Sequence, residues 1–333
     1  MSTADATVRA ILGDRRSMSP REHGTAYAPA NVALVKYWGK RDETLNLPRT
    51  ASLSVSLGGL GTYTGIRPID GDTDRVTLND EPVAPESSFG RRLSTFLDLF
   101  RRPDGPRFDI RTRNTIPTAA GLASSASGYA ALVMALDQLY AWKLTPREQS
   151  VLARLGSGSA SRSVYSGFVL WRLGSQPDGL DSYAEPLPMT WPDLRVGVIT
   201  ISSTDKGLGS RPAMRRTMET SALYSTWPEI VGRDLRQIQS ALQHNDFQTL
   251  GIVAERNAMA MHATMLGAWP PILYWQPGTV DALHRLWRLR DDGLAVYATM
   301  DAGPNIKVLF QAADTAALSA AFPDLQIIAP FGE

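Results

Sequence analysis

The chain has 333 residues, of which 43% are hydrophobic and 20% are charged, a composition typical of a globular protein with one large core or two moderate ones. Its formal net charge of +1 provides no global positive field for nucleic acid, so we expect no nucleic-acid partner. The absence of cysteine excludes disulfides, thiolate metal sites and cysteine nucleophiles, and is consistent with a reducing compartment.

The first 24 residues carry scattered charges and lack the apolar core of a secretory signal. No apolar run in the chain reaches the length that spans a membrane. We therefore expect a cytoplasmic protein with no membrane partner, in which residues 1–24 form a flexible extension.

The chain then becomes rich in strand patterns. We expect strands at Val32–Tyr37, Leu53–Leu57, Thr62–Ile66, Arg75–Leu78 and Phe108–Thr112, and an amphipathic helix at Ser88–Phe100. Lys36, Tyr37 and Lys40 would then lie at the end of the first strand. Lysines in this position reach phosphorylated ligands as point charges, and a tyrosine adds a hydroxyl donor. A solvated turn is the alternative interpretation.

The central stretch Asn114–Tyr140 passes from a turn rich in glycine and serine into an apolar helix. Apolar residues spaced three and four apart predict one buried helix face. Small residues at the helix start would let a polyphosphate approach backbone N–H groups that a helix beginning leaves unpaired. The alternative is a helix of small residues packed closely on a neighbour.

A helix at Thr145–Leu155 follows, with Pro146 at its first position. After it, Ser157, Ser159 and Arg162 provide hydroxyl donors and a guanidinium fork suited to carboxylate or phosphate oxygens. The proline-rich stretch 176–192 has the composition of a connection between domains. We predict an N-terminal half at residues 25–190 and a C-terminal half at residues 191–333.

The C-terminal half begins with a predicted strand, Leu194–Ile201. Lys206, Ser210 and Arg211 lie in the glycine-containing loop that follows, which would either close over a ligand or remain an ordinary exposed loop. We then expect helices at Glu229–Gln243, Phe247–Met265 and Thr279–Asp291, and strands at Ala295–Thr299 and Lys307–Gln311.

Asp301 lies in the turn between those last two strands. This position suits a catalytic carboxylate and equally a plain turn, because aspartate is a good turn former. The four histidines have no metal-ligand spacing, so we interpret them as structural or surface groups.

Four separated stretches together resemble the diphosphomevalonate decarboxylases of the GHMP kinase superfamily. They are Ala28–Lys40 (APANVALVKYWGK), Pro117–Ala131 (PTAAGLASSASGYAA), Gly156–Phe168 (GSGSASRSVYSGF) and Asp301–Asn305 (DAGPN). The segment His262–Tyr274, HATMLGAWPPILY, is also similar to that family. Many small-molecule kinases share the glycine- and serine-rich loop, whereas KYWGK and GSGSxxR narrow the resemblance to the decarboxylases.

The resemblance implies an α+β GHMP kinase fold, with an N-terminal α/β half like ribosomal protein S5, a C-terminal ferredoxin-like half and a central cleft. It also implies ATP-dependent conversion of mevalonate 5-diphosphate to isopentenyl diphosphate, through phosphorylation of the 3-hydroxyl, with Mg2+ carried by the ATP phosphates. Decarboxylation of mevalonate 5-phosphate, or phosphorylation without decarboxylation, remain alternatives. A homodimer is implied as well.

The resemblance further implies roles for particular residues. Asp301 would orient or deprotonate the hydroxyl, Arg162 would hold the substrate carboxylate with help from Ser159, and Lys40 would complete the catalytic set. The substrate would contact Tyr37, Ser157, Ser159, Ser210 and Arg211. ATP would contact Pro117, Gly121, Leu122, Ser124, Ser125 and Lys206, with its phosphates cradled by Ser124, Ser125 and the backbone from Gly121 and with no protein ligand to the metal.

One departure from the family pattern lies near the expected cleft. Where the family has Asn-Ser-Ser after Leu-Pro, this chain has Arg49-Thr50-Ala51-Ser52. An amide and a hydroxyl are therefore altered, which bears on whether the substrate carries one phosphate or two.

Overall fold

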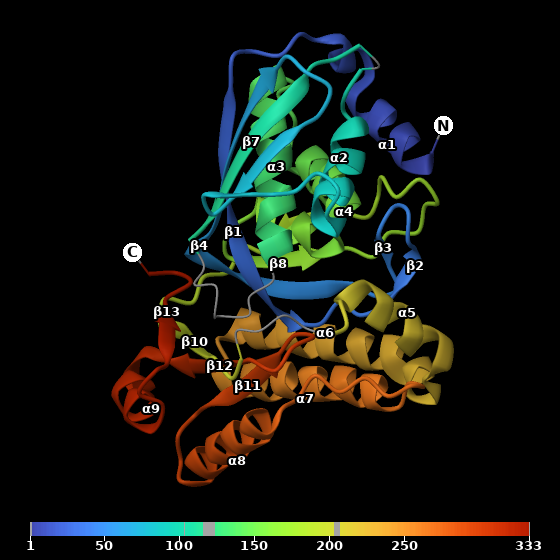
Figure 1. The fold of residues 1–333 in the computed structure, drawn as a ribbon. Helices are drawn as coiled ribbons and strands as arrows, with labels where there is room; N and C mark the ends of the chain where they lie inside the picture. Colours follow the sequence, from blue (N-terminus) through green and yellow to red (C-terminus); the bar gives the residue numbers. More distant parts are fainter. Residues whose placement is uncertain (1, 103, 116–123, 203–206, 333) are drawn as a thin grey trace.

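Two long antiparallel strands, β1 (Gly24–Val35) and β4 (Ser52–Ile69), extend from the N-terminal half of the protein toward the C-terminal half (Figure 1). The structure is a computed structural model, and it describes residues 2–102, 104–115, 124–202 and 207–332. The fold is mixed α+β, as the sequence predicts.

Seven of the strands in the described ranges form one sheet around β4, in the order β6-β5-β7-β4-β8-β9, with β1 on the other edge of β4. The remaining members are β5 (Arg75–Leu78), β6 (Glu81–Pro82), β7 (Arg107–Asn114), β8 (Phe168–Trp171) and β9 (Ala184–Pro186). Three helices cover one face, α2 (Ser88–Asp98), α3 (Ser124–Tyr140) and α4 (Pro146–Gly156), and α3 packs directly on β1 and β4. A short hairpin of β2 (Lys40–Asp42) and β3 (Leu47–Pro48) lies beside them, and the 3-10 helix η3 (Gly158–Val164) follows α4.

The strand β4 replaces the two separate strands predicted at Leu53–Leu57 and Thr62–Ile66. Glycines between them suggest a turn, but the chain stays extended, and Gly58 adopts φ 59°, which glycine tolerates without strain. As a result one strand pairs with β8 through Ser52–Val55 and with β7 through Thr62–Ile69. The first strand is likewise displaced from its predicted range, because β1 ends at Val35 and leaves Lys36 and Tyr37 beyond it.

The N-terminal residues do not form the flexible extension that we expected. Residues Thr3–Leu12 form helix α1, capped by the Ser2 side chain, and η1 (Gly13–Ser17) follows it. Val8 and Leu12 are buried in the core of the N-terminal half. Arg15 joins this segment to α4 through an ion pair with Glu148 at 2.6 Å.

The C-terminal half contains a four-stranded antiparallel sheet in the order β11-β12-β10-β13, counted over the described residues. Its strands are β10 (Leu194–Ile199), β11 (Tyr297–Met300), β12 (Ile306–Gln311) and β13 (Gln326–Ile328). Its helical segments are α5 (Ser210–Thr220), η4 (Ala222–Thr226), α6 (Trp227–His244), α7 (Phe247–Leu266), α8 (Pro277–Asp291), η5 (Ala312–Asp314) and α9 (Thr315–Ala321). In the part of the chain that is described, no helix is long and apolar enough to cross a bilayer.

The two halves share a hydrophobic core. Val32 and Leu34 of β1 and Val55 of β4 belong to the same buried cluster as Ile238 of α6 and Val253 of α7. The lower ends of the long strands therefore lie against the helices of the C-terminal half, and the residues that immediately follow β1 are placed where the two halves meet.

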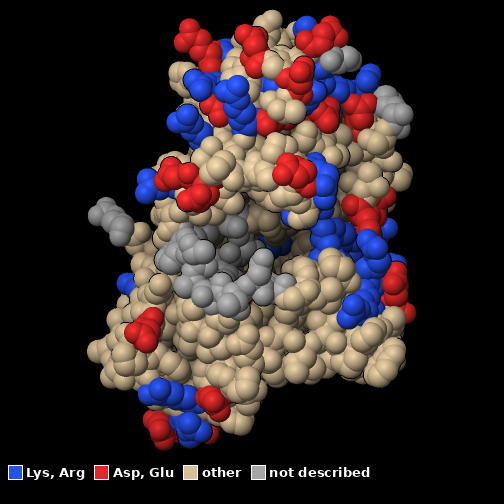
Figure 2. All heavy atoms as spheres, viewed as in Figure 1, with Lys and Arg blue, Asp and Glu red and all other residues tan. Residues whose placement is uncertain are grey.

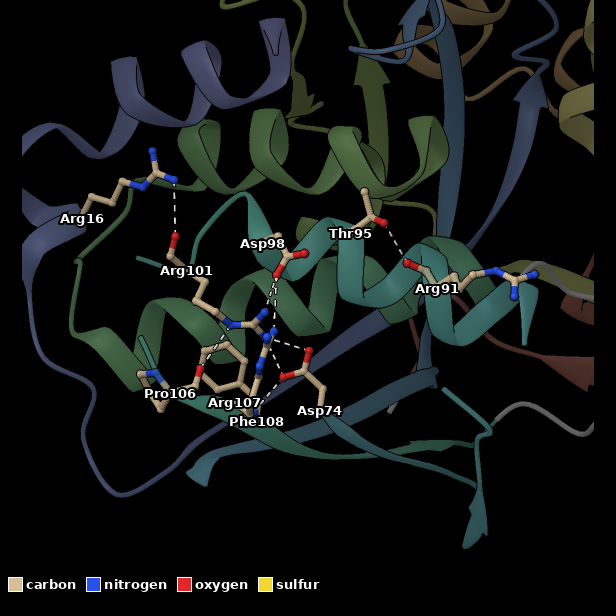
Figure 3. A network of polar contacts seen from close by, with 9 residues as sticks. All are labelled: Arg16, Asp74, Arg91, Thr95, Asp98, Arg101, Pro106, Arg107 and Phe108. Carbon is tan, nitrogen blue, oxygen red and sulfur yellow. Dashed lines mark hydrogen bonds and ion pairs between the residues drawn. The ribbon is translucent and has the colours of Figure 1, made fainter. Parts of the chain in front are cut away.

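A buried arginine, Arg101, holds together the far end of the N-terminal half (Figure 3). Its guanidinium donates to both oxygens of Asp74 at 2.6 and 2.7 Å, to Asp98, and to the Pro106 carbonyl at 3.2 Å. It also lies 5.1 Å from the centroid of the Phe108 ring. Only 5% of the Arg101 side chain is exposed, so its charge depends on these partners.

We predict that Arg101→Met lowers the free energy of unfolding by about 3 kcal/mol, because it leaves the buried carboxylate of Asp74 without its cation. The matched control is Arg91→Met on the neighbouring helix, where the side chain is exposed and the change should stay within about 0.5 kcal/mol. Denaturant unfolding followed by circular dichroism measures both. Equal stability of the two variants would contradict the prediction.

Candidate active site

Asp301 is the centre of a cluster of cations where the two halves meet. It follows β11, and its Oδ1 accepts a hydrogen bond from Lys36 Nζ at 2.9 Å. Its Oδ2 lies 3.5 Å from Nζ of Lys307, on β12. Both lysine side chains are only 2% exposed, whereas the aspartate is 28% exposed and remains accessible to a ligand.

Burial lowers the pKa of Lys36, and the positive charges of Lys307 and Arg162 lower it further, while Asp301 opposes the shift. The carboxylate therefore provides the counter-charge for closely spaced cations. A ligand that brings additional negative charge would relieve their mutual repulsion.

His262 contacts the backbone of Asp301. It lies on α7, and its Nε2 is 3.2 Å from the backbone oxygen of Asp301. Burial, together with the nearby charge of Lys36, lowers the pKa of His262 to about 3. The imidazole is therefore neutral, and its Nε2–H donates to the carbonyl and holds the turn that carries the carboxylate.

Arg162 lies on η3 with only 3% of its surface exposed. Its guanidinium donates to the hydroxyls of Ser54 at 3.1 Å and Ser52 at 2.7 Å, both on β4, and to the Asn31 amide oxygen at 3.3 Å. Within the described ranges, no carboxylate lies at ion-pair distance from it. Burial lowers its pKa to about 10, and Asp301 lies near enough to oppose that shift.

A second group of cations surrounds Tyr37 and Lys40. Lys40 Nζ donates to Asn46 Oδ1 at 2.6 Å, and burial lowers its pKa to about 8, with a further contribution from Arg211. Burial raises the pKa of Tyr37, whereas Arg211 and Arg162 act against the shift. The buried Tyr37 hydroxyl makes no hydrogen bond within the described part of the protein.

The start of α5 lies against the loop after α4. Ser210 is the first residue of α5, and the neighbouring Arg211 donates to the Gly156 carbonyl at 2.6 Å. Beyond that carbonyl, the Ser157 and Ser159 hydroxyls lie 3.4 Å apart. Figure 2 shows a hollow between the two halves, with Lys and Arg side chains gathered along the side on which α5 lies.

A separate cavity of about 220 Å3 lies in the N-terminal half at the start of α3. Ser125 and Gly128 of α3 line it together with hydroxyl and apolar side chains of the sheet and of α2. The other lining residues are Thr62, Thr64, Leu78, Phe89, Leu93, Ile110, Thr112, Asn114, Tyr129 and Leu132. In the described residues, no group of three or more His, Asp or Glu is placed to hold a metal ion.

The structure brings several of the predicted site residues together. Asp301 and Arg162 are near one another, and Tyr37, Lys40 and Arg211 form the adjacent group. Ser125 lines the cavity at the start of α3, whose wall also includes Tyr129, a residue close enough to Arg211 to feel its charge. Pro117, Gly121, Leu122, Lys206 and the Ser124 side chain lie outside the described residues.

Two residues that contact Asp301, Lys307 and His262, were missed in the sequence analysis. Lys36 was named there only as a lysine that could reach a phosphorylated ligand, and its ion pair with Asp301 was not predicted. Lys307 was noted only as the start of a strand, and His262 as a structural or surface group. Lys307 and His262 come close to Asp301 only in the folded chain, so no local sequence pattern could reveal these contacts.

The mixed α+β fold places the protein in a class, the enzymes with the GHMP kinase fold. Within that class, residues 28–184 match the diphosphomevalonate decarboxylase-like N-terminal domain, and residues 196–327 match the mevalonate 5-diphosphate decarboxylase C-terminal domain. The chain is 38% identical to the diphosphomevalonate decarboxylase of Aspergillus fumigatus over 315 residues, which cover 87% of this chain and 77% of that relative.

Comparison with solved structures gives the same result as the family models. The mevalonate diphosphate decarboxylase of Staphylococcus aureus superposes with a TM-score of 0.87 at 37% identity, over 92% of this chain and 95% of that one. A structure described as MDDEF in complex with MVAPP, AMPPCP and magnesium gives 0.86 at 37% identity, over 92% and 96%. The chain therefore belongs to the diphosphomevalonate decarboxylase family, whose members are enzymes that decarboxylate.

We predict that His262 makes stability depend on pH. The folded protein keeps His262 neutral down to about pH 3, whereas the unfolded chain takes up a proton near its ordinary pKa of 6.5. Acidification from 6.5 therefore favours unfolding, by about 1.4 kcal/mol per pH unit. His262→Gln lacks this contribution, so the stability of wild type relative to the variant should decrease by that amount per unit between pH 6 and pH 4.

Urea unfolding at pH 7, 6, 5 and 4 measures the difference. His244→Gln, at an exposed position on α6, is the control for removal of a histidine. A constant difference between wild type and His262→Gln would show that the imidazole is not held neutral.

Proposed function

We propose that this protein catalyses the ATP-dependent decarboxylation of mevalonate 5-diphosphate to isopentenyl diphosphate, ADP, phosphate and CO2, as in the mevalonate pathway of isoprenoid biosynthesis. Family membership supports the reaction. The observation that carries it is the arrangement around Asp301, which is flanked by Lys36 and Lys307 and lies near Arg162, a buried cation with no carboxylate at ion-pair distance in the described residues.

The first step is phosphorylation of the substrate's tertiary hydroxyl. Asp301 accepts the proton from this hydroxyl while its oxygen bonds to the γ-phosphorus, and the bond from that phosphorus to the ADP oxygen breaks. Lys36, in contact with Asp301 Oδ1, stabilises the negative charge that develops on the oxygens around the reacting centre.

The second step breaks two bonds. The phosphorylated oxygen leaves with its bonding electrons as phosphate, and the bond between the carboxylate and its neighbouring carbon supplies the electron pair of the new double bond, so CO2 departs. Arg162 would hold that carboxylate in a bidentate fork and fix the bond that breaks. The serines Ser52 and Ser54 hold the fork in place before substrate arrives.

The diphosphate end of the substrate would bind the second group of cations. Lys40 and Arg211 provide positive charge there, and the Tyr37 hydroxyl provides a donor. Ser157 and Ser159, which follow α4, and Ser210, at the start of α5, would complete this subsite. The altered stretch after Leu-Pro keeps its last serine, Ser52, which contacts Arg162.

ATP would bind at the start of α3. The cavity there combines an apolar lining from α2 with hydroxyl groups from the sheet, which fits a nucleoside, and Ser125 lies at the helix beginning, where phosphates are favoured. Mg2+, carried by the ATP phosphates, would neutralise their charge. The described residues at that cavity include hydroxyl and amide oxygens but no carboxylate cluster, which suits a metal brought in by the nucleotide.

The resemblance to the family supports two further proposals, a homodimer and a cytoplasmic location, and the lack of cysteine is consistent with the second. Sedimentation equilibrium tests the first, and cell fractionation with an antibody tests the second. The division at residues 190 and 191 into two halves also remains a proposal.

The test of function is release of CO2 and ADP by purified protein with Mg-ATP, offered mevalonate 5-diphosphate and mevalonate 5-phosphate in parallel. We expect both products from the diphosphate. Preference for the monophosphate would contradict the proposed substrate, and ADP without CO2 would contradict the decarboxylation.

We predict that Asp301→Asn lowers kcat by about 10^3-fold, because an amide cannot accept the hydroxyl proton. ATP binding, measured by calorimetry, should stay within about threefold, because the carboxylate acts on the hydroxyl and not on the nucleotide. Asp324→Asn, at an exposed position after α9, serves as the control and should retain full activity. Near-normal turnover by Asp301→Asn would refute the catalytic assignment.

We also predict a pH dependence from Lys40. Its pKa of about 8 means that the ammonium loses its proton above that pH and no longer attracts the diphosphate, so kcat/KM for this substrate should fall as pH rises past 8. Lys40→Gln should have a KM about tenfold higher at pH 7, and its kcat/KM should not fall as pH rises past 8.

Lys143→Gln, at an exposed position between α3 and α4, should keep the wild-type profile. If Lys40→Gln retains the alkaline limb, another group is responsible for it.

A further inference from the structure

We propose that Asn257 on α7 is a positioning residue that fixes Lys36 against Asp301. The inference builds on the proposed function, in which these two residues act on the reacting hydroxyl. Neither Asn257 nor the groups that hold it lie among the residues assigned to substrate or nucleotide above.

The contact lies at the end of β1. Asn257 is fully buried, and its Oδ1 accepts a hydrogen bond from the backbone N–H of Lys36 at 2.8 Å. Val35, one residue earlier, is the last residue of β1 to pair with β4. The lysine backbone is therefore held by the C-terminal half, although the strand that leads to it belongs to the N-terminal half.

The orientation of the Asn257 amide is determined by its other partner. Its Nδ2 donates to Oδ2 of Asp234 on α6 at 2.9 Å, and that carboxylate is also fully buried. An ionised carboxylate only accepts, so the amide nitrogen must face Asp234 and the amide oxygen must face Lys36. Arg256 at 2.5 Å and Arg233 at 3.1 Å provide the carboxylate's counter-charge.

Helix α7 therefore holds the backbone of both residues of the ion pair, Lys36 and Asp301. Asn257 holds the Lys36 backbone, and His262, five residues later on the same helix, holds the backbone carbonyl of Asp301. Because both backbones are fixed to one helix, the lysine side chain only has to reach from its own backbone to the Asp301 carboxylate. Its ammonium lies 2.9 Å from the carboxylate, and the lysine side chain is only 2% exposed.

The test is Asn257→Asp, which makes the contact depend on pH. Protonated, the introduced carboxyl donates to Asp234 and accepts from the Lys36 N–H, as the amide does. Ionised, it loses the donor and faces the Asp234 carboxylate. The charged groups around it are Asp234 and Arg233 from α6, Arg256 on α7, and Lys36 with its ammonium on Asp301. Two adjacent buried carboxyls share one proton, so as pH rises the variant loses the hydrogen bond to Asp234, and repulsion between the two carboxylates moves the side chain at position 257 out of its place beside the Lys36 N–H.

We expect the kcat of Asn257→Asp to be close to wild type at pH 6 and about 100-fold lower at pH 8.5, each compared with wild type at the same pH. KM for both substrates should stay within about threefold, because the phosphates bind elsewhere. Asn257→Leu, which can make neither hydrogen bond, should have low kcat at both pH values. Thermal unfolding in the same buffers verifies that each variant is folded at the assay temperature.

The matched control is Val253→Ala, one helical turn earlier on α7 and buried in the shared core. It should destabilise the protein while leaving kcat and its pH profile at wild-type values. A ratio of Asn257→Asp to wild-type kcat that does not change with pH would overturn the proposal, as would an equal loss in Val253→Ala.

Crystal structures of Asn257→Asp at pH 6 and pH 8.5 provide a second readout that needs no substrate. We expect the distance from Lys36 Nζ to Asp301 Oδ1 to match wild type at pH 6 and to lengthen beyond ion-pair range at pH 8.5. An unchanged distance would refute the positioning role. If wild type releases no CO2 but the distance responds to pH, the proposed function fails while the positioning inference stands.

Discussion

The ion pair between Lys36 and Asp301 is the contact on which the arrangement of the site depends. The two residues come from opposite halves of the protein, 265 positions apart in the chain, and each is held by backbone contacts to α7. A buried lysine is unfavourable unless its charge is compensated, so the pair exists only when the halves are packed as observed. Folding of the whole chain is thus a precondition for the chemistry.

The balance of charge around this pair explains the kind of ligand that the site accepts. Lys36, Lys307 and Arg162 converge near one carboxylate, and Arg162 relies on neutral oxygens of two serines and an asparagine. Such a cluster is costly in the free protein, because buried like charges repel and neutral donors compensate a guanidinium only in part. A multiply charged anion would offset this cost, so the cluster favours ligands of that kind.

Much of the fold and part of the site could be predicted from the sequence. Arg162 and Asp301 were proposed from the motifs in which they lie, and the structure places them near one another. The main helices were predicted from their apolar period. Lys36 was not distinguished from Lys40, because that choice depends on the residue at which β1 ends, and strand ends are set by pairing with β4. The two strands predicted at Leu53–Leu57 and Thr62–Ile66 are one strand, because the chain between them continues through a shift in its pairing with β1. Helix α1 had a local signal, Ser2 as cap with Ala4, Val8 and Leu12 at helical spacing, which the flexible-extension hypothesis overlooked.

The core shared by the two halves has a consequence for how ligands enter. β1 and β4 are embedded at one end in the N-terminal sheet and at the other among α6 and α7, so rotation of one half against the other would break apolar contacts. Such an interface opposes the closure of two lobes around a ligand. We therefore expect ligand-free and ligand-bound forms to keep the same packing of β1 and β4 on α6 and α7.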